Sequence, residues 1–356
     1  MTTLYVTEPY AIVKKSGDTL EIQIPENKQT GSAARKVQVP LVKVDQVVIL
    51  GDSTLTAQAL TALIEQKAAI TFLSAYGQFR ARLVPAESRN SLLRLAQFRA
   101  HEDAGRSFAL ARQFVAGKLH NARTLLLRSN RKLGDAAVAA AAESLRGILA
   151  QVLALQGDGI PPADAGKPQA GTAWGTLQGL EGAGSAQYFG VFGSLLRGDA
   201  LLGFETRSRR PPRDPVNALL SYGYTLLLHQ CCAGLQIVGL DTYVGYLHSA
   251  QYSKPALGLD LMEEFRAPVV DSVVVTLINN RILVADDFLE ELGAYRLKDR
   301  PRRTFLEKFE ERLNTEIAHP VFKYPATYRR CIELQARLLA KALTGELADY
   351  PPFKVR

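Results

Sequence analysis

The stretch from His248 to Glu263 carries residue types that could hold a divalent metal ion. His248 is followed by a loop with Pro255 and Gly258, and Asp260 and Glu263 come after that loop. Because Asp260 and Glu263 are three positions apart, their carboxylates would share one face of a helix. An imidazole held near such a face can bind a hard or borderline divalent cation. Buried structural histidines are common, so the pattern by itself leaves a purely structural His248 open.

Glu181 is the best candidate for a third ligand. It lies in the segment LEGAGSAQYF (180–189), where an acid among small and apolar residues is unusual for a solvated helix face. Small neighbours let another helix or a substrate approach closely. The alternative is an acid near a helix N-terminus that the macrodipole favours, and the local pattern does not separate these two interpretations.

The positive charge of the chain is concentrated in one region. The 356 residues contain 43 Lys and Arg against 35 Asp and Glu, a net charge of +8. Residues 80–132 alone contain 12 Lys and Arg against three acidic residues. A basic helical segment of this kind indicates a polyanion partner, whose phosphates it would hold without reading bases. The charge pattern is equally compatible with an ordinary solvated helix face.

Composition favours a globular protein in a reducing compartment. Hydrophobic residues make up 47% and charged residues 22% of the chain, and no run of about 18 consecutive apolar residues occurs. The N-terminus lacks the basic and apolar regions of a signal peptide. Cys231, Cys232 and Cys331 form no CxxC pair. We therefore expect free thiols, a cytoplasmic location and no membrane contact.

Two regions must position these residues, and together they predict an α+β protein. Residues 1–86 alternate apolar and polar positions in short runs, which predicts a small N-terminal β domain with one helix capped by Asp52 or Ser53. Residues 87–356 have helical patterns, which predict a large all-α catalytic domain. In it, residues 91–132 are expected to form a long helical segment. Asp214 and Pro215 are expected to begin a buried helix.

Four separated motifs, in order along nearly the whole chain, resemble the CRISPR-associated endonuclease/integrase of spacer acquisition, the Cas-one family. They are LEGAGSAQYF, RPPRDPVNALLSYGYTLL (210–227), GYLHS (245–249) and DLMEEFR (260–266), and LARQFVAGKLHNARTLLLR (110–128) also looks like that family's first helical region. By position, the resemblance implies that Glu181, His248 and Glu263 are the metal ligands. It implies that Asp260 is a nearby acid that supports the catalytic site.

The resemblance also implies partners. It implies a homodimer that binds a small ferredoxin-like protein, Cas-two, and in some systems a spacer-processing nuclease. The N-terminal β domain is a plausible place for the dimer or partner contact. The DNA substrates would be a spacer precursor duplex and the repeat and leader of a CRISPR array.

The chemistry of the residues agrees with this interpretation. Two carboxylates and one neutral imidazole suit Mn²⁺ or Mg²⁺, and such a site could support attack on a phosphodiester by a DNA 3′-hydroxyl or by water. Lys254, Arg266, Arg210 and Arg213 are candidates for phosphate contacts, although each taken alone fits a surface charge.

Two alternatives to an enzyme remain open. One is a non-catalytic DNA-binding scaffold, and the other is a structural subunit whose basic face binds an acidic protein. The intact acid/His/acid set disfavours the scaffold, because a protein without catalytic activity need not keep all three metal ligands.

Overall fold

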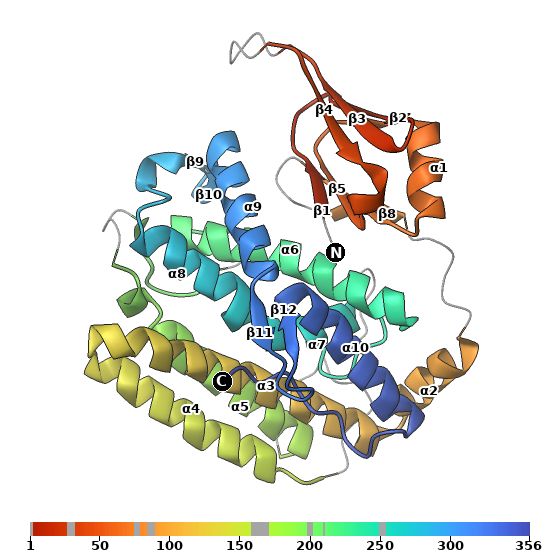
Figure 1. The fold of residues 1–356 in the computed structure, drawn as a ribbon. Helices are drawn as coiled ribbons and strands as arrows, with labels where there is room; N and C mark the ends of the chain where they lie inside the picture. The colour runs from red at the N-terminus through yellow and green to blue at the C-terminus, as the bar shows by residue number, and fades with distance from the viewer. Residues whose placement is uncertain are drawn as a thin grey trace. The chain divides into compact units, whose positions relative to one another are not determined.

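The chain forms two compact units, Met1–Glu87 and Ser88–Arg356. The computed structural model describes residues 3–26, 33–74, 79–83, 90–157, 171–197, 202–208, 211–248 and 254–356. The first unit consists of strands with one helix, and the second is mostly helical (Figure 1). The predicted α+β class is therefore confirmed in its coarse form.

The described residues of the N-terminal unit form two four-stranded sheets, one α-helix and a short 3-10 helix, Leu41–Lys43. The strand orders are β1-β5-β7-β8 and β4-β3-β2-β6. The elements are β1 (Thr3–Val6), β2 (Ile12–Ser16), β3 (Thr19–Ile24), β4 (Arg35–Pro40), β5 (Gln46–Leu50), β6 (Thr54–Leu55), α1 (Ala57–Glu65), β7 (Ala69–Leu73) and β8 (Phe79–Leu83). The alternation in β3 places Leu20 and Ile22 in one buried core with Val47, Ile49 and Ile70.

The start of α1 corrects the predicted cap. Residues 54–55 pair with β2 as a short parallel strand, so the chain is still extended after Asp52 and Ser53. Thr56 caps the helix instead, and its Oγ1 accepts a hydrogen bond from the backbone N of Ala59 at 3.4 Å. Because residues 54–55 pair as a strand, the helix begins after Thr56 and not after Asp52 or Ser53.

Helices provide the frame of the C-terminal unit. They are α2 (Ser91–Glu102), α3 (Ala104–Leu133), α4 (Ala136–Ala154), α5 (Ala173–Gly190), α6 (Pro215–Val238), α7 (Ala256–Phe265), α8 (Ser272–Asn279), α9 (Asp299–Leu313) and α10 (Tyr328–Thr344), with a π-helical segment, Arg266–Asp271, between α7 and α8. The helices α3, α4 and α5 pack side by side, and α7 packs against both α3 and α6 (Figure 1). The candidate ligands on α5 and α7 thus lie on two helices that both pack against α3.

The predicted start of α6 is confirmed. Asp214 is the N-cap, and its Oδ1 accepts a hydrogen bond from the backbone N of Asn217 at 2.7 Å. Pro215 occupies the first turn, where its missing N–H costs no hydrogen bond. The helix is buried along most of its length, as its apolar sequence predicts.

Two features correct the prediction of an uninterrupted, all-α second domain. The segment 91–132 is broken at Asp103, whose extended ψ of 107° ends α2 and whose Oδ1 caps α3 by accepting from the backbone N of Arg106 at 2.9 Å. Two antiparallel hairpins also lie in this unit: β9 (Phe288–Glu291) with β10 (Ala294–Leu297), and β11 (Glu316–Ala318) with β12 (Pro325–Thr327). The unit is therefore mostly helical.

The helix α4 has the length and composition of a membrane span within the described residues. Its Val138, Leu145 and Val152 are buried, and it packs against α3 and α5. The Glu143–Arg146 ion pair lies on its exposed side. Although only 28% of its most apolar 18-residue window is buried, helices of soluble proteins pass the same length and composition test, and a single such helix is weak evidence for a membrane span.

Candidate metal centre

Glu181 reaches the centre because α5 packs closely against α3. A Cβ atom at Gly184 would lie 2.3 Å from Cδ2 of Leu119, so any larger residue there would require the Leu119 side chain to shift. Glu181 lies one turn earlier on α5, with 29% of its side chain exposed. Its Oε1 accepts a hydrogen bond from Ser185 Oγ at 3.1 Å. Of the small residues around Glu181, Gly184 serves helix packing, whereas Gly182 and Ala183 are exposed.

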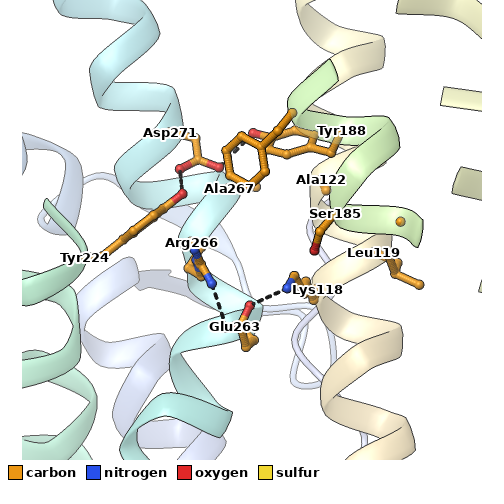
Figure 2. Close-up of a pocket in the computed structure, with 12 residues that line it drawn as sticks. Lys118, Leu119, Ala122, Ser185, Tyr188, Tyr224, Glu263, Arg266, Ala267 and Asp271 are labelled. Atoms are coloured by element: carbon orange, nitrogen blue, oxygen red, sulfur yellow. Dashed lines mark hydrogen bonds and ion pairs between the residues drawn. The ribbon is translucent and has the colours of Figure 1, made fainter. Parts of the chain in front are cut away.

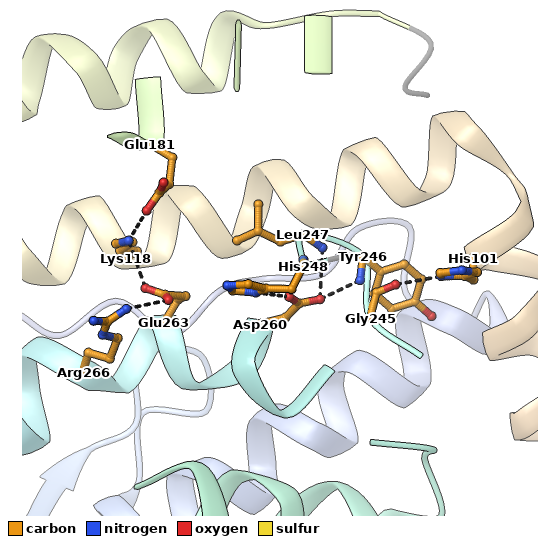
Figure 3. A network of polar contacts seen from close by, with 10 residues as sticks. All are labelled: His101, Lys118, Glu181, Gly245, Tyr246, Leu247, His248, Asp260, Glu263 and Arg266. Carbon is orange, nitrogen blue, oxygen red and sulfur yellow. Dashed lines mark hydrogen bonds and ion pairs between the residues drawn. The ribbon is translucent and has the colours of Figure 1, made fainter. Parts of the chain in front are cut away.

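Asp260 holds His248 in one orientation. The fully buried Asp260 Oδ1 lies 2.7 Å from Nδ1 of His248 and accepts from the backbone N of His248 at 2.9 Å. Its Oδ2 accepts from the backbone N atoms of Tyr246 at 2.6 Å and Leu247 at 3.0 Å (Figure 3). Because a carboxylate only accepts, the contact assigns the proton to Nδ1 and leaves the lone pair of neutral His248 on Nε2. Asp260 thus has its acceptor sites occupied, and it positions the imidazole.

Glu263 lies on α7 between two cations. Arg266 Nη1 donates to its Oε1 at 2.7 Å, and Lys118 Nζ lies 3.1 Å from its Oε2. Burial alone would raise the pKa of Glu263, but the Arg266 guanidinium and the Lys118 ammonium outweigh it and hold the pKa below its ordinary value. Glu263 is therefore an ionised carboxylate with only 5% of its side chain exposed.

Lys118 joins the two acidic ligands that the sequence suggested. It projects from α3 with 12% of its side chain exposed, and its ammonium contacts both Glu181 and Glu263 (Figure 3). In the described part of the chain, no three His, Cys, Asp or Glu side chains are gathered closely enough to hold a metal ion as they stand. The Lys118 ammonium contacts both carboxylates, so the position between them holds a positive charge of the chain itself. Two carboxylates with the Nε2 atom of His248 fit Mn²⁺ or Mg²⁺ in donor type.

A pocket lies beside these residues, lined by Lys118, Glu263 and Arg266 as well as by apolar side chains such as Leu119 and Phe189. Figure 2 shows Lys118 and Glu263 on one side of it and a buried cluster, Asp271 with Tyr188 and Tyr224, on the other. Tyr224 donates to Asp271 Oδ1 at 2.6 Å and Tyr188 donates to Oδ2 at 2.7 Å. Burial raises the pKa of Asp271, although the two hydroxyl donors oppose the shift.

A helical pattern by itself would suggest that Asp271 and Glu264 are solvated or paired helix charges, but both are buried and therefore not solvated. Glu264 anchors the C-terminal tail: its carboxylate accepts from Phe353 N at 2.6 Å and from the Tyr350 hydroxyl at 2.8 Å. Asn121 of α3 donates to the carbonyl oxygens of Glu264 and Phe353 at 2.6 and 2.8 Å. The C-terminal tail therefore contacts α7 at Glu264, the residue next to Glu263, and contacts α3 at Asn121.

The predicted phosphate contacts have different environments. Arg266 is 8% exposed, and its guanidinium pairs with Glu263 and lies 4.1 Å from the ring centroid of Tyr224. Lys254 is partly exposed just before α7, and Arg213 is exposed just before α6. Arg210 lies outside the described residues. Arg266 thus belongs to the centre itself rather than to the surrounding surface.

Several basic residues of α3 bind carbonyl oxygens of other elements. Arg106 donates to Leu343 O at 3.0 Å and Arg112 to Leu155 O at 2.6 Å, which places them at the ends of α10 and α4. Arg123 donates to Ala142 O at 3.1 Å. Cations are favourable at helix C-termini, so part of the basic segment has a structural role. Arg131 and Lys132 remain exposed in its last turn.

Sequence reasoning did not find Lys118, although the sequence carried a signal for it. The buried stripe of α3 runs through Ala111, Phe114, Val115, Leu119 and Ala122. Lys118 occupies the position on that stripe between Val115 and Leu119, at the spacing of one helix turn. A lysine on an apolar stripe needs a buried anionic partner, which points to the acidic ligands.

Comparison with known proteins supports the family resemblance that the four sequence motifs indicate. The sequence profile described as CRISPR associated protein Cas1 matches residues 4–311. CRISPR-associated endonuclease Cas1 3 of Thermus thermophilus is 38% identical over 99% of this chain and 97% of its own length. A CRISPR-associated exonuclease Cas4/endonuclease Cas1 fusion of Geobacter sulfurreducens is 38% identical over 99% of this chain, which spans 60% of that fusion.

Solved structures share the fold. A casposase bound to integration product has a TM-score of 0.82 at 24% identity and covers 100% of this chain and 95% of its own. A Cas1 protein from Thermotoga maritima has a TM-score of 0.77 at 23% identity and covers 97% of each chain. The predicted resemblance is confirmed, and the chain belongs to the CRISPR-associated Cas1 family.

Proposed function

We propose that this chain is a metal-dependent DNA endonuclease/integrase that inserts new spacers into a CRISPR array by phosphodiester transesterification. The observation that carries the proposal is the arrangement around α3. Glu181 and Glu263 share one cation, and Asp260 orients His248 through its Nδ1 atom. An anionic pair with a neighbouring imidazole is a donor set for Mn²⁺ or Mg²⁺.

Glu181, His248 and Glu263 would hold the metal ion. The chemistry that a bound Mn²⁺ or Mg²⁺ supplies is polarisation of a phosphoryl oxygen and activation of the attacking oxygen. Asp260 keeps the Nε2 lone pair of His248 available, and Arg266 keeps Glu263 ionised. A DNA 3′-hydroxyl would lose its proton and form the new bond to phosphorus, while the bond from phosphorus to the 3′-oxygen of the repeat strand breaks and that oxygen takes up a proton.

DNA and protein partners follow from the family and the charge. Exposed basic residues such as Arg131, Lys132 and Arg213 are suited to hold the DNA backbone. Solved structures of the same fold include a Cas6-RT-Cas1--Cas2 complex, and two curated relatives are Cas4/Cas1 fusions. We infer a cytoplasmic homodimer that works with Cas2, and with a spacer-processing nuclease in systems that have one. The N-terminal unit is proposed as the dimer or partner contact.

A strand-transfer assay tests the proposal through His248→Ala. The reaction would contain short duplex DNA with free 3′ ends, a repeat-bearing target, Cas2 and Mn²⁺ or Mg²⁺. We expect integrated product from the wild type and a loss of at least about 100-fold in His248→Ala, because a metal ligand is removed. His101→Ala is the matched control: His101 Nδ1 contacts Gly245 O at 2.7 Å, outside the ligand set. Equal product from wild type and His248→Ala would contradict the metal assignment.

The same assay separates the enzyme from a DNA-binding scaffold. A scaffold would bind the DNA and the partner yet give no product with either metal in the complete wild-type reaction. Binding of the same duplex, measured with a nucleic-acid competitor, distinguishes DNA from an acidic protein as the partner of the basic surface.

A further inference from the structure

Lys118 is an internal cation where the proposed function requires a metal ion. Its ammonium contacts Glu181 and lies 3.1 Å from Glu263 Oε2, and its side chain is 12% exposed. Figure 3 shows the Lys118 ammonium reaching from α3 to the carboxylates of Glu181 on α5 and Glu263 on α7. The two acids therefore already share one positive charge of the chain, and Glu263 pairs with Arg266 as well.

The contact between Lys118 and Glu263 is chiefly electrostatic. Oε2 of Glu263 is buried and has no aligned hydrogen-bond donor, although the ammonium is within ion-pair distance. Oε1 of the same carboxylate already accepts from Arg266 at 2.7 Å. Glu263 therefore keeps one strong cationic partner when Lys118 moves away, and Oε2 becomes available to another cation.

An ammonium and a divalent cation cannot both lie between the two carboxylates. They would compete for the same oxygens and repel each other strongly at low exposure. Lysine is suited to leave, because it is a point charge on a flexible stem with four carbons. Resting on the function proposed above, we propose that Lys118 is a resident counter-ion that a divalent metal must displace, so that it sets the metal affinity of the free protein.

Lys118→Met tests this by metal binding and needs no DNA reaction. The affinity for Mn²⁺ would be measured by isothermal titration on the full chain. We expect Lys118→Met to bind Mn²⁺ at least about 10-fold more tightly than the wild type, because a competing positive charge is gone. Its melting temperature without metal should fall, and Mn²⁺ should raise it more than it raises that of the wild type.

Three further variants make the result specific. Lys118→Gln removes the charge and keeps a polar side chain, so it should also bind Mn²⁺ more tightly and replaces the Met variant if that does not fold. Lys118→Arg keeps the charge and should not tighten binding. Lys132→Met is the matched control, since Lys132 is exposed on the same helix, and it should bind as the wild type does.

The outcomes separate this inference from the proposed function. One outcome is that His248→Ala weakens Mn²⁺ binding while Lys118→Met and Lys118→Gln bind Mn²⁺ no more tightly than the wild type. In that case the proposed displacement of Lys118 by the metal is wrong, and the proposed metal site is retained. If His248→Ala leaves Mn²⁺ binding unchanged both alone and in the Lys118→Met background, the metal site itself is wrong. Tighter binding in both neutral variants that depends on His248 supports the displacement.

Discussion

Replacing Glu263 by Gln is expected to lower strand transfer by about 1,000-fold or more, which corresponds to about 4 kcal/mol of transition-state stabilisation. Glu263 is the most buried of the three proposed ligands, and the change removes its charge while keeping its shape. The amide would also leave Lys118 and Arg266 without the carboxylate between them. Folding stability should therefore fall as well, because two poorly exposed cations lose their shared partner.

The Glu263 experiment needs a control for stability and for the type of change. Glu311→Gln makes the same substitution at an exposed residue of α9 that pairs with Lys308, and it should retain full activity. Both variants would be assayed below their melting temperatures, with the folded fraction measured by circular dichroism. A Glu263→Gln protein that is folded and keeps more than about a tenth of the wild-type rate would contradict its role as a ligand.

Asp260→Asn is expected to lower metal affinity and strand transfer by about 10- to 100-fold, the usual effect of losing a carboxylate behind a ligating histidine. The reason is geometric. Asp260 accepts three backbone N–H groups and the Nδ1–H of His248, and an amide would turn an N–H group toward one of these donors. The His248 imidazole would lose its fixed orientation but could still bind the metal ion.

A double-mutant cycle distinguishes this positioning role from a second, independent ligand. Once His248 is Ala, Asp260 has no imidazole to orient, so Asp260→Asn should lower metal affinity by far less in that background. The same titration of Mn²⁺ would be applied to the wild type, both single variants and the double variant. Full additivity of the two losses would show that Asp260 acts on the metal independently of His248.

The elements predicted correctly from the sequence were those with local signals. The Asp214 and Pro215 helix start and the alternation of β3 depend on neighbouring residues, and both occur as predicted. The break at Asp103 was missed, because the segment on either side is equally helical in pattern. The hairpins β9-β10 and β11-β12 were missed because each strand has only three or four residues, too few for a period to be recognised.

The environment of the centre could not be predicted, because it depends on contacts between distant segments. Glu264 is held by the tail at Tyr350 and Phe353, and nothing near Glu264 in the sequence indicates this. Arg266 appeared to be a surface cation, yet α6 and α7 bury it against Tyr224. Lys118 was predictable in principle from its place on a buried helix stripe, but its partners Glu181 and Glu263 come together only through helix packing.

The most direct test of the central claim is an anomalous difference map from crystals of this protein soaked in Mn²⁺. The account predicts one strong manganese peak bounded by the carboxylates of Glu181 and Glu263 and by Nε2 of His248, with the Lys118 ammonium turned away. It also predicts that Asp260 contacts the imidazole and not the metal. A fully soaked crystal with no manganese between Glu181, His248 and Glu263, or with manganese bound only at other acidic residues, would contradict the account.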